Sequence, residues 1–181
     1  MNELLDLLFG KAGESLNDRI EKLKENTTKI VSSTCKNTEA CLKTHNLMLR
    51  YYSALDTLGT EYIKQLEDMR EKINNIDFES ADFDEFPTIV NEFKTNMVPV
   101  FGQALVDIGT LGDSYAKELP LIVVRGLEQT EDLSHVVVYC TKYLRSIKTE
   151  IKTLVTTFGG EDDFETEIDK YIAKNIKKEE V

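Results

Sequence analysis

Residues 48–62 read MLRYYSALDTLGTEY and contain the apolar repeat that decides the predicted fold. Apolar side chains recur there at alternating steps of three and four residues: Met48, Tyr51, Leu55, Leu58 and Tyr62. This spacing places all five on one face of an α-helix, as in the seam of a coiled coil. The stretch therefore predicts a long amphipathic helix, and we take its five apolar residues as a candidate self-association seam.

The same helix extends in both directions from this seam. Between residues 16 and 76 the sequence contains no proline and a single glycine, Gly59, so a helix of about 60 residues meets no strong breaker. We predict one helix over residues 15–76. Polar residues replace apolar ones in the middle of its stripe, between residues 27 and 44, so a division into two helices near residues 36–38 is the alternative.

An acidic connection separates this helix from the next one. Residues 77–86, DFESADFDEF, interrupt the stripe, and Pro87 follows them in a position that suits the first turn of a helix. The apolar pattern then resumes and predicts a helix over residues 87–132. Pro99 and Pro120 lie inside this helix and each removes a backbone hydrogen-bond donor, so we expect the helix to be kinked.

Three shorter amphipathic segments complete the predicted architecture. They are an N-terminal segment over residues 1–14, a helix over residues 133–158 and a C-terminal helix over residues 161–178, whose acids come first and lysines last. With only three prolines and nine glycines in 181 residues, the fold class is all-α. We predict a single helical domain, an elongated antiparallel coiled-coil-like bundle with three to four main helices, two of them long and kinked.

The net charge of the chain, −11, bears on its partners and location. This charge repels the phosphates of nucleic acids at long range, so we expect no nucleic-acid partner. No apolar stretch approaches the roughly 20 residues that cross a bilayer, and the N-terminal sequence lacks the pattern of a secretory signal. The expected location is cytoplasmic, with peripheral membrane association as a further option.

The sequence contains no pattern that is typical of catalysis or of metal binding. Signatures of phosphate-binding loops, dinucleotide sites, zinc proteases and nucleophile elbows do not occur. Cys35, Cys41 and Cys140 form no CxxC pair, and His45 and His135 do not supply the spacing of a zinc site. We therefore expect a non-enzymatic protein without a cofactor, a metal or a small-molecule substrate.

Four basic residues recur at intervals of seven in the first predicted helix: Lys29, Lys36, Lys43 and Arg50. Seven residues are close to two helical turns, so the four cations share one stripe. Such a stripe can meet lipid phosphates or the acids of a protein partner, and it can equally be a solvated face. We keep the four residues as a candidate lipid- or partner-binding surface.

Two stretches, YYSALDTLGTEYIKQLEDM at residues 51–69 and FGQALVDIGTLGDSY at residues 101–115, resemble helices of the BAR superfamily, in particular its IMD and F-BAR branches. The resemblance covers residues 45–120. It implies an elongated antiparallel helical dimer that senses or imposes membrane curvature through a basic surface. The four basic residues of the stripe above are the only candidates for that surface.

Two functions follow from these observations. The first is a BAR-like scaffold or adaptor that dimerises and binds a membrane surface. The alternative is a coiled-coil structural subunit of a cytosolic protein assembly, which pairs with helical partners without contacting lipid. In both cases the expected partner is a second copy of the chain or another helical protein.

Overall fold

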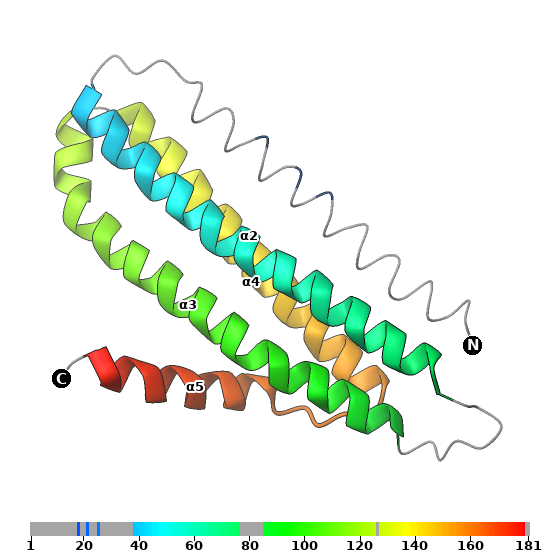
Figure 1. The fold of residues 1–181 in the computed structure, drawn as a ribbon. Helices are drawn as coiled ribbons and strands as arrows, with labels where there is room; N and C mark the ends of the chain where they lie inside the picture. The colour runs from blue at the N-terminus through cyan, green and yellow to red at the C-terminus, as the bar shows by residue number, and fades with distance from the viewer. Residues whose placement is uncertain are drawn as a thin grey trace.

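The computed structural model describes residues 38–76, 85–125 and 127–179, together with Asp18, Glu21 and Glu25. Its helices are drawn in Figure 1: α2 (Thr38–Asn74), α3 (Glu85–Arg125), α4 (Leu127–Thr157) and α5 (Phe164–Glu179). The described part of the chain contains no strand, which confirms the all-α class expected from composition and periodicity.

The boundary between α3 and α4 lies at residue 126, whereas the apolar pattern placed it between residues 132 and 133. The sequence has a glycine at position 126, and this residue lies outside the described part of the chain. Apolar residues continue at helical spacing on both sides of it. Periodicity alone therefore did not reveal where one helix ends and the next begins.

Several parts of the predicted organisation lie outside the described residues. These are the segment over residues 1–14, most of the acidic connection, and the start of the helix predicted over residues 15–76. The choice between one helix and two near residues 36–38 stays open for the same reason. The kinks expected at Pro99 and Pro120, which both lie within the bounds of α3, stay a prediction.

The three longest helices lie alongside one another, and α5 crosses α3 (Figure 1). α2 packs against both α3 and α4, α3 packs against α4, and α5 packs against α3. Consecutive helices among the first three run in alternate directions, as Figure 1 shows. Each of the three therefore has the other two as neighbours against which its apolar stripe can be buried, and α3 also packs against α5.

The core lies between α2, α3 and α4 and consists of the residues at helical spacing. In α3 the buried positions are Val90, Phe93, Met97, Phe101, Ala104 and Leu111. In α4 they are Val136, Cys140, Tyr143, Leu144, Ile147, Ile151, Leu154 and Val155. Full burial of one such large apolar side chain stabilises the folded state by about 1.5–3 kcal/mol, so these stripes dominate the stability of the fold.

The turn between α4 and α5 is fixed by a hydrogen-bond pattern at the end of α4. The amide of Gly160 donates to the carbonyl of Val155 at 2.8 Å, and the amide of Gly159 donates to the carbonyl of Thr156 at 3.3 Å. These two bonds form a Schellman motif, which requires a left-handed residue just after the helix. Gly159 fills that position with a φ of 76°, and glycine adopts it without steric cost.

The same turn is docked against the first turns of α3. The side-chain oxygen of Asn91 accepts a hydrogen bond from the amide of Glu161 at 3.0 Å. The rings of Phe86 and Phe158 stack nearby, with centroids 6.2 Å apart. On α5, Phe164 meets Phe101 edge to face, with centroids 5.7 Å apart. The direction in which α5 leaves the bundle is therefore set by contacts with α3.

Lys94 is a charged residue buried in this junction, with a relative exposure of 4 %. Its ammonium donates to the carbonyl oxygen of Glu161 at 3.2 Å and forms an ion pair with the carboxylate of Asp163. The hydrogen bond from Lys94 and the positive charge of Lys94 hold the pKa of Asp163 below its ordinary value of 3.8. A buried charge is tolerated only when it is paired in this way.

We expect Gly160→Ala to destabilise the fold, because a Cβ atom there would lie 2.8 Å from Val90 Cγ1 and 2.9 Å from Val155 Cγ1. The expected loss in the free energy of unfolding, measured by urea denaturation, is about 1–3 kcal/mol. Gly109→Ala is the control, because no atom of the described residues outside the neighbouring turns of its own helix lies within 4 Å of its Cβ position. Inside a helix this change should stabilise by about 0.5–1 kcal/mol. Equal effects of the two substitutions would contradict the assigned packing.

We expect Asp163→Ala to lower the free energy of unfolding by about 1–3 kcal/mol at neutral pH, because it leaves the buried ammonium of Lys94 without its carboxylate. Lys94→Met removes the buried ammonium, and the remaining carboxylate of Asp163, whose side chain is 38 % exposed, can be solvated, so this variant should stay within about 1 kcal/mol of the unsubstituted protein. Urea denaturation measures both variants.

The destabilisation by Asp163→Ala should also depend on pH. The pKa of Asp163 is lower in the folded chain, so the ion pair contributes fully above 3.8 and its contribution is lost as the pH falls through the folded-state value. The free energies of unfolding of the unsubstituted chain and of Asp163→Ala, plotted against pH, should converge only in that acid range. A constant difference across it would show that the ion pair is not the cause.

Candidate functional site

The candidate self-association seam lies in the core of the single chain. Met48 is 4 % exposed, Tyr51 and Leu58 are 1 % exposed, and Leu55 and Tyr62 are fully buried. The helices that cover α2 belong to the same chain, because α2 packs against α3 and α4. A second copy could reach Met48, Tyr51, Leu55 and Tyr62 only if the bundle opened, whereas Leu58 also belongs to the lining of the groove described below. Self-association of the folded chain therefore requires a different surface.

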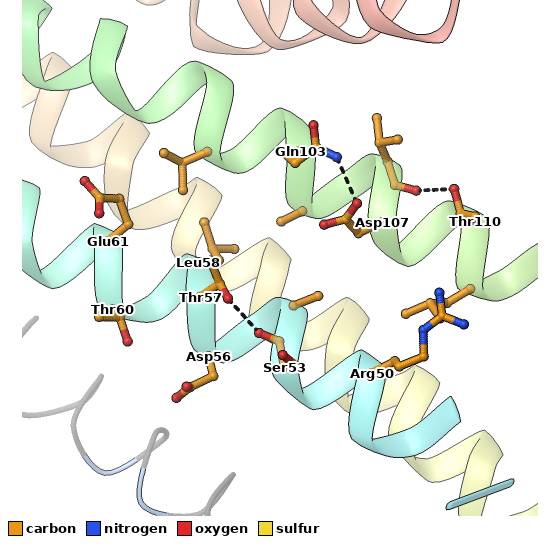
Figure 2. A pocket seen from close by; sticks show the side chains of 15 residues that line it. Arg50, Ser53, Asp56, Thr57, Leu58, Thr60, Glu61, Gln103, Asp107 and Thr110 are labelled. Carbon is orange, nitrogen blue, oxygen red and sulfur yellow. Dashed lines mark hydrogen bonds between the residues drawn. The ribbon is translucent and has the colours of Figure 1, made fainter. Parts of the chain in front are cut away.

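The structure describes only part of the candidate basic stripe. Lys29 and Lys36 lie outside the described residues, and Lys43 belongs to α2 although its side chain is outside the described part. Arg50 is exposed, and within the described residues it forms no ion pair. It lies at one end of a groove between α2 and α3 (Figure 2).

This groove has a volume of about 950 Å³ and is the candidate functional site. Its walls are residues 50–61 of α2 and residues 100–111 of α3. The apolar part of the lining consists of short or branched side chains: Ala54, Leu58, Val100, Ala104, Val106 and Leu111. The polar part includes hydroxyl and charged side chains: Arg50, Ser53, Asp56, Thr57, Thr60, Glu61, Gln103, Asp107 and Thr110.

Short side chains on facing positions keep the groove open. Ala54 of α2 and Ala104 of α3 carry only a methyl group, and two threonines of the lining are bonded to their own helices. The hydroxyl of Thr57 donates to the carbonyl of Ser53 at 3.0 Å, and that of Thr110 donates to the carbonyl of Val106 at 2.9 Å. The bent-back hydroxyls and small methyl groups leave space between the two helices.

The groove carries more negative than positive charge. Asp56 has no ion pair within the described residues, and Asp107 accepts a hydrogen bond only from the neutral amide of Gln103, at 2.8 Å. Glu61 accepts hydrogen bonds from Gln65 at 2.9 Å and from Lys64 at 3.2 Å, and these bonds lower its pKa. With Arg50 as the one cation of the lining, three carboxylates leave a net charge of −2.

Histidine, cysteine and clusters of metal-binding side chains are absent from the residues that line the groove. The described part of the chain has no cluster of three His, Cys, Asp or Glu side chains that could hold a metal ion. The groove contains neither histidine nor cysteine that could act as a nucleophile or base. Its chemistry, a lining of methyl groups with a mostly acidic polar rim, is suited to binding.

Cys140 is the cysteine whose side chain the structure describes, and it is buried in α4, with a relative exposure of 1 %. Loss of solvation on burial raises the pKa of its thiol to about 12. Because the thiolate is the reactive form of cysteine, this side chain is a small apolar core residue in chemical terms.

Within the described ranges, none of the helices combines the length and the low charge content needed to span a bilayer. Comparison with family models, with curated proteins and with solved structures finds no match to this chain. The functional argument therefore rests on the groove and on the charges around it.

Sequence reasoning missed the acidic residues of the groove and the buried lysine. Asp56 and Glu61 lie on α2 and Asp107 lies on α3, and no motif links them. Lys94 has a weak signal, because it lies four residues after Val90 and three before Met97, within the buried stripe of α3. Such a position predicts burial for an apolar residue, but a lysine there is read as a surface residue.

We expect Cys140 to resist thiol reagents in the folded protein at pH 8, because the high pKa keeps it protonated and the core keeps reagents away. A Cys35→Ser/Cys41→Ser variant isolates this thiol, and a colorimetric disulfide reagent measures its reaction. Labelling should appear only in denaturant. Rapid labelling of the folded variant would place Cys140 outside the core.

Proposed function

We propose that this protein is a non-enzymatic helical scaffold that recognises another helix through the groove between α2 and α3. The single observation that carries the proposal is the groove itself. Its two walls are helices, its lining combines methyl groups with a charged rim, and the chain's main apolar stripe is already buried elsewhere.

The dimensions of the groove support a helix as its ligand. Each wall spans 12 residues, residues 50–61 and 100–111, which at 1.5 Å per residue gives a length of about 17 Å. That length accommodates about three turns of a docked helix. Amphipathic helices commonly bind in this way, with apolar side chains at intervals of three and four residues placed in the groove.

The wider expectations from the sequence form part of the same proposal. In it, the chain is an elongated antiparallel coiled-coil-like bundle that acts as an adaptor in the cytoplasm, with a helical protein as partner. The resemblance of residues 51–69 and 101–115 to BAR helices supports an adaptor of this shape. Both stretches contribute to the walls of the groove.

We expect Thr57→Trp to abolish partner binding by filling the groove with an indole ring. The matched control is Thr141→Trp on α4, because both threonines are exposed and both donate their hydroxyl to the carbonyl four residues earlier. In affinity purification from a cell extract, one stoichiometric helical partner should co-purify with the unsubstituted chain and with Thr141→Trp. Thr57→Trp should lose it. Retention of that partner by both variants would exclude the groove as the binding site.

Anionic liposomes provide the test against the lipid-binding alternative. We expect the chain not to co-sediment with phosphatidylserine-containing vesicles at physiological salt, because Arg50 is accompanied in the groove by Asp56, Glu61 and Asp107. The comparison uses Lys29→Glu/Lys36→Glu/Lys43→Glu/Arg50→Glu. If the unsubstituted chain sediments with the vesicles and this variant does not, the proposed protein adaptor is wrong. A BAR-like membrane scaffold then takes its place.

A further inference from the structure

Helix α5 changes charge along its length, and its second half is basic. The first turn contains Glu165 and Glu167, whereas the lysines of the helix come later, at positions 170, 174, 177 and 178. Lys170 and Lys174 are four residues apart and both are exposed, so they share one face of the helix. Lys170 pairs with Glu167 at 2.6 Å, and Lys174 has no ion pair within the described residues.

Helix α5 is anchored by its first half. Asp163 pairs with Lys94, Phe164 packs on Phe101, and Ile168 is buried. The Tyr171 ring packs so closely on α3 at Gly102 that a Cβ atom there would collide with the ring. Beyond this crossing α5 diverges from α3, as Figure 1 shows. Lys174, which is exposed, follows these contacts along the helix.

The groove and α5 are connected through Gln103. The hydroxyl of Tyr171 donates to the side-chain oxygen of Gln103 at 3.3 Å, and the amide of Gln103 donates to Asp107 in the groove at 2.8 Å. Figure 2 shows the ribbon of α5 on one side of α3 and the groove residues on the other. The acidic groove and the basic helix thus flank the same stretch of α3.

From this placement we infer that the groove binds α5 of a second copy of the chain, in a symmetric dimer held by lysine–carboxylate pairs. Lys170 and Lys174 of each copy meet Asp56 and Asp107 of the other. This inference rests on the proposed function, because it names the occupant of the groove as the same protein.

A twofold axis that runs parallel to α3 produces this arrangement. Rotation by 180° about such an axis exchanges the two flanks of α3, so α5 of each copy faces the groove of the other. The same contact then occurs twice, as expected for an isologous dimer. The charges are complementary, because the groove lining has a net charge of −2 and residues 170–179 contain four lysines and one glutamate.

Charge exchange between the two surfaces tests the inference. One variant carries Asp56→Lys and Asp107→Lys, and the other carries Lys170→Glu and Lys174→Glu. Asp107 and both lysines are exposed and Asp56 is partly exposed, so we expect both variants to fold, which circular dichroism checks. In a dimer formed by either variant alone, like charges face each other at both contacts. Their mixture restores opposite charges at both contacts.

We expect the unsubstituted chain to be a dimer in analytical ultracentrifugation and each variant alone to dissociate at least about tenfold more readily. An equimolar mixture of the two variants should recover the dimer as a heterodimer. Raising the salt from about 0.1 M to about 1 M shortens the screening length from about 10 Å to about 3 Å and should weaken the unsubstituted dimer.

Two results would overturn the inference. If the unsubstituted chain is monomeric, a second copy is excluded as the occupant of the groove. Binding of another helix in the groove is then tested separately, by the affinity purification with Thr57→Trp. A dimer that survives charge exchange excludes the lysine–carboxylate contacts. If Thr57→Trp nevertheless dissociates that dimer, the groove is the interface but α5 is not its occupant, so failure of the inference is distinguished from failure of the proposed function.

Discussion

The long helices of this protein each carry one apolar stripe, and the fold depends on burying these stripes against one another. In α2 the stripe includes Leu55, Tyr62 and Ile73, which have no exposed surface at all. Burial of this kind is favourable without regard to direction, so any helix of matching spacing could in principle cover it. Here the covering helices are α3 and α4 of the same chain. What remains for recognition is the surface between helices and the charges that border it.

The position of α5 depends on a second constraint, the buried ammonium of Lys94. An unpaired charge at that depth would be costly, so the turn after α4 must present both the carbonyl of Glu161 and the carboxylate of Asp163 to it. The left-handed Gly159 allows the chain to turn sharply enough to do so. The direction in which α5 leaves the bundle, and with it the separation of its basic end from α3, is thus fixed by a polar contact as well as by Phe164.

The sequence predicted the helices better than it predicted their use. The steps of three and four at Tyr51, Leu55 and Leu58 correctly indicated a buried helical face, but burial by the same chain and burial by a partner produce the same periodicity. The groove could not be predicted, because Asp56 and Asp107 line the same groove only when α2 and α3 pack. The burial of Lys94 was not predicted, because a charged residue is expected at the surface. The spacing of the apolar residues in α3 nevertheless places this position in the core.

The hydroxyl groups of the helices have a chemical consequence of their own. Thr57, Thr110, Thr141 and Thr153 each commit their only hydroxyl proton to a carbonyl one turn earlier. Such an oxygen retains lone pairs but has no proton left to give, so it can accept hydrogen bonds and cannot donate them. Rows of threonine on these helices therefore favour ammonium, guanidinium and amide groups, and they offer little to a phosphate or a carboxylate.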